Sequence, residues 1–483
     1  MSTTVTPEDS TAPGLAKSSM GGFEVLAQSV AGIAPSAVMA TGPALVAIGA
    51  GGSIMHAYAV STVILLMVGW CITKFARREA ANGTLLTYIA KAFGPAAGFV
   101  GAAGLAFGYA LIAVGCLAGV SLYVEPLLGA IGMPGAHSTA TTLVIEVIAA
   151  ALAAFAMVRG VQLSTRIGVV LEVVSIVSIL VVIGAVLTTH GLTLAPLHPP
   201  GLSSGGVASG MVLAILGYVG FESAACMGTE AKLASTTIPR AVLGSVVIAC
   251  VLYLISSYAQ LVGFGEPAKI TASVAPLNDL ADSAGVHPLG YLIDVGAAAS
   301  FFACVTGSLN AAGRLAFSMG QDRLLHRSIG LAHPARKTPH LALIGLSTVC
   351  ALIAVVMTAS GITLMNVFAY AGTIGTYGYM IAYILITTGA AVYLYRVKAP
   401  IGSAVVVGGL ATAGMCYVLY SSVYPVPEAP YNLLPWIFLG VLVLAGAWYA
   451  FVKARLGRGT ETESRSSPRP RLNAEVAVEA TGD

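Results

Sequence analysis

Twelve apolar segments, each near or above the length that crosses a lipid bilayer, constrain the fold of this sequence more than any other feature. A membrane-spanning helix needs roughly 20 consecutive, mostly apolar residues. Because the bilayer core offers no water to backbone N–H and C=O groups, such segments fold as helices. The sequence therefore predicts an all-α polytopic membrane protein with 12 transmembrane helices. They are expected at residues 25–48, 54–76, 96–128, 138–157, 163–189, 205–231, 240–264, 288–318, 340–359, 362–391, 402–423 and 432–452.

The composition supports a membrane protein and argues against several other classes. Of the 483 residues, 57% are hydrophobic and 9% are charged, whereas soluble domains carry about 25% charged residues. A net charge of +3 is too small to indicate a nucleic-acid partner. The seven cysteines lie within or at the edge of apolar segments and form no CxxC pair, so no disulfide framework, metal site or cofactor is expected.

The distribution of basic residues predicts the orientation in the membrane. Lys and Arg follow the second, fourth, sixth, eighth, tenth and twelfth segments, and of the 23 only Lys269 falls on the opposite side. Because cytoplasmic loops carry the excess of Lys and Arg, both termini are expected in the cytoplasm of a cell-membrane protein. Residues 1–20 and 455–483 are polar or charged and are expected to be disordered cytoplasmic tails. Residues 21–454 then form the transmembrane domain.

The sixth segment carries signals that break a helix at membrane depth. Gly217 and Gly220 bracket Tyr218 and Val219, and Glu222 follows almost at once. Backbone groups freed by a break survive only against protein or a water-filled cavity, so a break of this kind indicates a site. A glycine notch for close helix packing is the alternative. The adjacent carboxyl of Glu222 favours the functional interpretation.

The first segment is predicted to break as well. Gly32 and Pro35 lie three residues apart, and proline removes one donor and frees a carbonyl one turn earlier. We expect the helix to unwind from Ala31 to Ala37, although a simple proline kink would also explain the pattern. Segments one and six each begin a group of five, and matching interrupted helices indicate an inverted-repeat transporter.

Three blocks resemble the amino acid-polyamine-organocation (APC) superfamily of permeases, in a bacterial amino acid permease branch. Gly220-Phe221-Glu222, with Ile238 to Ala241 further on, is similar to the sixth helix of that superfamily. Residues 308–341 and the glycines of the tenth segment are similar to later parts. The sequence departs from the family at 233–237, LASTT, where members usually have Asn-Pro, and at 32–37, which has fewer glycines than most members.

The resemblance implies a five-plus-five inverted repeat, at about 25–189 and 205–391, with broken helices one and six. Two extra helices, 402–452, would be peripheral. It also implies alternating access, with the backbone of the two breaks holding an amino acid. This assignment agrees with the chemistry, because half-helix N-termini favour a carboxylate and half-helix C-termini an ammonium group. The candidate substrate-binding residues are Gly32, Ile33, Ala34, Pro35, Ser36, Ala37, Tyr218, Val219, Gly220, Phe221 and Glu222.

Two carboxyl groups inside the predicted spans are candidates for coupling transport to an ion gradient. Glu222 lies beside the second break and either titrates during transport or ties the two helix halves together. Glu172 in the fifth segment is either a proton carrier or a polar partner for a neighbouring helix. Proton-coupled members of the superfamily often have a lysine at the equivalent point, so their lysine mechanism does not apply here. Glu146 and Glu24 are interpreted as structural.

The function expected from the sequence is secondary transport of an amino acid, with proton-coupled uptake ahead of sodium coupling. There is no GxxxxGK[ST] motif for nucleotide hydrolysis and no pair of catalytic residues, so an enzyme is not expected. A polyamine or other organic-cation carrier, or an amino acid exchanger, is the alternative within transport. A channel or receptor-like membrane protein is the alternative from another class, although a channel would keep a continuous polar stripe. The motifs are the same for symport and exchange, and none of them specifies the oligomeric state.

Overall fold

The computed structural model describes residues 21–79, 85–159, 162–199, 202–227, 231–333, 336 and 338–466, so the predicted tail 1–20 and most of the predicted tail 455–483 lie outside the described residues. Within them every regular element is helical, as predicted. The α-helices are α1 (Gly22–Ile33), α2 (Pro35–Ala50), α3 (Ile54–Glu79), α4 (Leu85–Phe93), α5 (Pro95–Ala130), α6 (Thr139–Arg159), α7 (Gln162–His190), α8 (Ser204–Leu216), α9 (Ala234–Phe264), α10 (Pro267–Ala272), α11 (Pro276–Ser283), α12 (Pro288–Gln321), α13 (His340–Ala359), α14 (Leu364–Arg396), α15 (Gly402–Ser421) and α16 (Leu434–Ser466).

Ten helical segments in the described part of the chain are long and apolar enough to cross a membrane. One of them, Pro35–Arg78, has 44 residues and at about 1.5 Å per residue would be far longer than a bilayer is thick. It contains α2 and α3, which are separated by a 3₁₀ turn, η1, at Gly51–Ser53. The shorter apolar helix α8 has 13 residues, because the break predicted in the sixth segment ends it early.

Three short helices were not predicted, because each is too short to span a bilayer. The helix α4 has nine residues and buries Leu85, Tyr88, Ile89 and Ala92, which lie on one face at helical spacing. That face packs against α5 and α14. Helices α10 and α11 connect α9 to α12, and α10 packs against α2. The last helix, α16, also continues through Ser466, beyond the end at 452 predicted from hydropathy.

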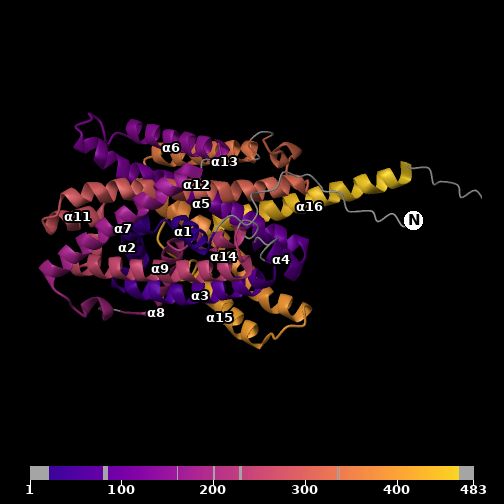
Figure 1. Ribbon diagram of the computed structural model, residues 1–483, viewed down its shortest axis with the longest axis horizontal. Coiled ribbons are helices and arrows are strands. Elements are labelled where there is room, and N and C mark those ends of the chain that lie inside the picture. Colours follow the sequence, from indigo (N-terminus) through magenta and orange to yellow (C-terminus); the bar gives the residue numbers. More distant parts are fainter. Residues whose placement is uncertain are drawn as a thin grey trace, which may run out of the picture.

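The centre of the bundle is built on α5, which packs along α14 and α12. Glycines permit the close approach of α5 and α14: a Cβ added to Gly108 would lie 2.9 Å from the carbonyl oxygen of Gly375. Small residues serve this purpose in membrane helices, where close backbone packing replaces the hydrophobic effect. Figure 1 shows α6 and α13 together along one edge of the molecule, α15 at the opposite edge, and α16 extending away from the bundle.

Candidate functional site

The first break occupies a single residue. The helix α1 ends at Ile33, Ala34 adopts the left-handed conformation with φ 53° and ψ 58°, and α2 begins at Pro35. The predicted unwinding from Ala31 to Ala37 was therefore too long. The physical reason is that proline suits the first position of a helix, where its missing N–H costs nothing, so α2 can restart at once.

The second break is where the sequence predicts it. The helix α8 ends at Leu216, a turn follows, and the chain continues as a 3₁₀ helix, η3, at Phe221–Met227. The predicted span 205–231 is thus interrupted after Leu216, and its described second half is a 3₁₀ helix instead of an α-helix. Gly220 has φ 108°, a conformation that essentially only glycine adopts without strain.

The two breaks contact each other through their backbones. A Cβ added to Gly220 would lie 2.8 Å from the carbonyl carbon of Gly32 and closer still to its oxygen. In the other direction, a Cβ added to Gly32 would lie 3.4 Å from the carbonyl oxygen of Gly220. Gly220 is therefore needed where the two interrupted helices cross, whereas a Cβ at Gly32 would lie at ordinary contact distance from the backbone of Gly220. The structure has the breaks closed against each other.

Glu222 anchors the second break to two other helices. Its side chain is 1% exposed. Its Oε1 accepts a hydrogen bond from the hydroxyl of Tyr109 on α5 at 2.7 Å, and its Oε2 accepts one from the hydroxyl of Tyr383 on α14 at 2.8 Å. The N–H of Gly220 also donates to Oε2, at 3.2 Å. Neither tyrosine was among the site residues predicted from the sequence, although a tyrosine inside an apolar segment needs a partner for its hydroxyl and so indicates a polar contact there.

Glu172 anchors the first break in a similar way. Its carboxylate oxygen Oε1 accepts a hydrogen bond from the backbone N–H of Ser36 at 2.7 Å. This places a carboxyl group of α7 at the N-terminus of α2, where the helix dipole favours negative charge. The two candidate coupling residues thus hold different breaks.

Donors from α9 satisfy carbonyl groups that the irregular helices leave free. Pro43 lies inside α2 and cannot bond to the carbonyl of Met39, which instead accepts from the hydroxyl of Ser256 at 2.6 Å. The carbonyl of Gly217 accepts from the hydroxyl of Tyr253 at 2.6 Å. Free backbone groups at membrane depth persist only with partners of this kind, so α9 stabilises both interrupted helices.

The aromatic residues of the second break pack into the bundle. Tyr218 shares a hydrogen bond of 2.7 Å with the hydroxyl of Thr62, and its ring lies edge-on to that of Tyr253. The centroid of the Phe221 ring lies 5.5 Å from that of the Tyr383 ring. Apart from Gly32, which is partly exposed, all the predicted substrate-binding residues are buried: Ile33, Ala34, Pro35, Ser36, Ala37, Tyr218, Val219, Gly220, Phe221 and Glu222.

Several buried hydroxyls near the breaks have no hydrogen-bond partner among the described residues. Tyr379 Oη and Ser223 Oγ are two of them, and Ser223 Oγ would lie 3.3 Å from a Cβ added to Gly32. Unpaired buried polar groups are uncommon and are costly without a partner. Glu146, by contrast, accepts a hydrogen bond from Thr358 at 2.8 Å and joins α6 to α13. In the described residues no group of three His, Cys, Asp or Glu side chains could hold a metal ion.

Comparison with known proteins identifies the family. The family model described as "Amino acid permease" matches residues 20–445. This chain belongs to the amino acid permease family of the APC superfamily. The permease is similar to the branched-chain amino acid permease BcaP of Lactococcus lactis subsp. cremoris (strain MG1363), with 25% identity over 355 residues, or 70% of this chain and 74% of the relative. BcaP of Bacillus subtilis (strain 168) is 24% identical over 351 residues, 70% of this chain and 74% of the relative.

A third relative is named for a different substrate. The low-affinity putrescine importer PlaP of Escherichia coli (strain K12) is 23% identical to this permease over 308 residues, or 61% of this chain and 65% of the relative. The permease is therefore a multi-pass membrane protein of amino acid transport, and its relatives are transporters rather than enzymes.

Proposed function

We propose that this permease is a secondary active transporter that carries an amino acid into the cell by alternating access. The observation that carries the proposal is the direct backbone contact between Gly32, in the last turn of α1 beside the first break, and Gly220 in the second break. Two interrupted helices that cross at membrane depth form the substrate site of inverted-repeat transporters. A channel or a receptor-like protein has no need of two paired breaks.

The proposed architecture has twelve spans, with both termini in the cytoplasm and α15 and α16 outside the repeats. The pattern of contacts supports the five-plus-five repeat. The first break is bound by Glu172 of α7, the fifth predicted span, and the second break is bound by Tyr383 of α14, the tenth. Each break is thus tied to the last span of its own group of five.

The backbone at 32–37 and 218–222 is proposed to hold the α-carboxylate and α-amino groups of the substrate. In the closed arrangement the breaks touch, so substrate entry requires them to separate. Glu172 already occupies the N-terminus of α2 through Ser36, so an ionised Glu172 and a substrate carboxylate compete for the same kind of donor. Protonation of Glu172 would free that donor, which links proton binding to substrate binding.

Glu222 is proposed as a second point of proton coupling. An ionised carboxylate is an acceptor only, and Glu222 accepts from three donors. The ionised form therefore matches the closed geometry. A protonated Glu222 would present a donor in place of one acceptor site, which weakens its hold on α5 or α14 and favours opening.

An amino acid with a branched aliphatic side chain is the proposed substrate, on the strength of the two BcaP relatives. The second candidate is a polyamine or another organic cation. It is favoured by the two buried carboxyl groups at the breaks and by the putrescine importer among the relatives. Exchange of one amino acid for another is a third form of the same transport.

Thermal stability of the purified permease, measured with a panel of amino acids and polyamines, tests the substrate class. A ligand that binds only the folded state raises the melting temperature. Leucine, isoleucine or valine should raise it, and putrescine should not. A rise with putrescine alone would replace the proposed substrate with the organic cation.

A further inference from the structure

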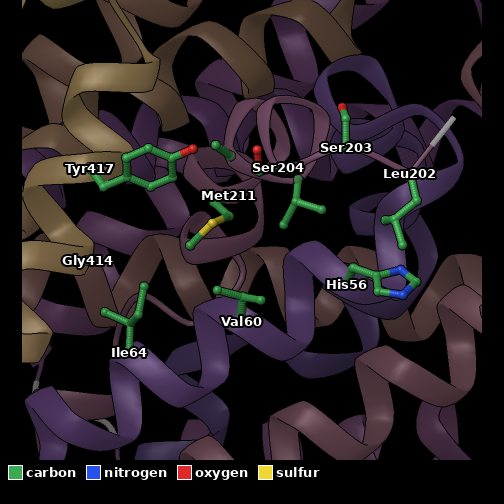
Figure 2. Close-up of a pocket in the computed structure, with 11 residues that line it drawn as sticks. His56, Val60, Ile64, Leu202, Ser203, Ser204, Met211, Gly414 and Tyr417 are labelled. Carbon is green, nitrogen blue, oxygen red and sulfur yellow. The ribbon is translucent and has the colours of Figure 1, made fainter.

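A lateral groove lies between α3, α8 and α15, away from the two breaks. Its volume is about 510 Å³, within the roughly 300–1,000 Å³ range of small-molecule sites. Figure 2 shows that α3 contributes His56, Val60 and Ile64 along one side, while Ser203, Ser204 and Met211 lie across from them and Tyr417 closes one end.

The groove opens on the outer face of helices that are apolar enough to cross a membrane. Val60 and Tyr417 at its rim are 42% and 46% exposed, whereas Ile64 and Met211 at its floor are 8% and 2% exposed. Both α3 and α15 belong to segments long and apolar enough to cross a membrane. Where such helices cross the bilayer, an apolar groove between them is in contact with acyl chains, which are the apolar groups available to fill it.

Polarity changes along the groove in one direction. His56, Val60 and Ile64 recur at every fourth residue of α3 and so lie on one face, over about 12 Å. His56 is near the start of α3 and beside the start of α8, where Ser203 caps the helix. The Nδ1 atom of His56 is buried and has no hydrogen-bond partner in the described part of the chain. The other end is formed by Ile64 and Gly414 with Tyr417, whose hydroxyl is its one polar side-chain atom.

We propose that a membrane phospholipid occupies this groove. One acyl chain lies along Val60 and Ile64 and contacts Met211 at the floor of the groove. The headgroup lies at the polar end, beside His56 and Ser203. The match rests on two features of an amphiphile in a bilayer: its polar end is at the membrane face, and its chain runs inward from there. The groove likewise has His56 and Ser203 at one end and mostly apolar side chains along the rest of its length.

A lipid at this position would contact a helix that carries the second break. Met211 lies on α8, six residues before Gly217, and α8 also meets α15 through a hydrogen bond from Ser421 Oγ to the carbonyl of Ala208 at 3.2 Å. The lipid therefore lies between α15 and a helix that moves if the breaks open. This inference does not depend on which substrate the permease carries.

Native mass spectrometry of the full-length permease, purified in a mild detergent, tests the proposal. We expect one phospholipid per chain to remain bound. The variant Val60→Trp should fill the groove and lose that lipid, whereas Val63→Trp, on the same helix and at a side chain that is 52% exposed but outside the groove, should keep it. Retention of the lipid by both variants would overturn the proposal.

A second measurement uses the wild-type chain, so it does not depend on the variants folding. The melting temperature is measured with added long-chain and short-chain phospholipids that share one headgroup. Stabilisation by the long-chain lipid alone would support the site, because only a long chain reaches Ile64. Equal effects of the two lipids on the melting temperature would contradict it. In the mass spectra, a second copy of the permease or a substrate molecule as the bound species would also contradict it.

Discussion

The hydroxyl of Tyr383 donates a hydrogen bond to Oε2 of Glu222 across 2.8 Å, and this contact joins α14 to the irregular backbone of the second break. Tyr109 completes the arrangement from α5. Two helices of the bundle therefore hold one carboxyl group that follows directly after Gly220-Phe221. The geometry of the break depends on groups far away in the sequence.

Removing the hydroxyl of Tyr383 should impair transport. A hydrogen bond to a charged group contributes about 1.5–3 kcal/mol, so Tyr383→Phe is expected to slow uptake by about tenfold or more. Tyr379→Phe is the matched control, because Tyr379 is on the same helix, is fully buried, and its hydroxyl has no partner among the described residues. The initial rates of labelled amino acid uptake are to be compared between the two variants. Equal losses in the two variants would show that the hydroxyl of Tyr383 has no special role.

Glu222→Gln should weaken the dependence of uptake on pH, since glutamine cannot exchange a proton at that site. The amide also carries two donors where the carboxylate has only acceptors, so one of the hydrogen bonds to Tyr109, Tyr383 or Gly220 must rearrange. Uptake is to be followed across a range of external pH at fixed membrane potential. An unchanged pH profile would make Glu222 a structural residue.

Glu172→Gln should lower the KM for a neutral amino acid and reduce its pH dependence. The reason is that the variant removes a charge that competes for the N-terminus of α2 at Ser36. Glu146→Gln is the control, because Glu146 is also a buried carboxyl in a span but bonds to Thr358 away from the breaks. A KM that rises in Glu172→Gln would indicate that Glu172 supports substrate binding instead of competing with it.

Gly220→Leu should abolish uptake while the protein still inserts into the membrane. The new side chain would meet the carbonyl of Gly32 at a backbone φ of 108°, and overpacking of this kind costs about 1–3 kcal/mol. Gly409→Leu on α15 has nothing within 4 Å of the added Cβ and should transport normally. Western blotting of membrane fractions checks insertion. Normal uptake by Gly220→Leu would remove the second break from the site.

Much of the fold could be predicted from hydropathy, because each long apolar helix corresponds to a continuous segment of apolar residues in the sequence. The breaks were visible for the same kind of local reason: Pro35 cannot bond one turn back, and Gly217 and Gly220 weaken a helix at membrane depth. The extent of the first break was not visible. Ala34 alone takes the left-handed conformation, because Pro35 suits the first position of a helix and α2 restarts at once.

The partners of the two carboxyl groups could not be derived from local patterns. Glu222 and Tyr109 are 113 residues apart, and Glu172 and Ser36 are 136 apart, so their pairing depends on how distant helices pack. The short helix α4 was missed for a different reason. Its buried face of Leu85, Tyr88 and Ile89 follows a helical period, but its nine residues fall below the length that hydropathy detects.

Amino acid transport through the two breaks is tested by uptake into proteoliposomes that contain only the purified permease and carry an imposed proton gradient. Labelled leucine, isoleucine or valine should accumulate, driven by the gradient, and the accumulation should be lost in Gly220→Leu. Accumulation of none of these amino acids, or equal accumulation by Gly220→Leu, would contradict amino acid transport through the two breaks.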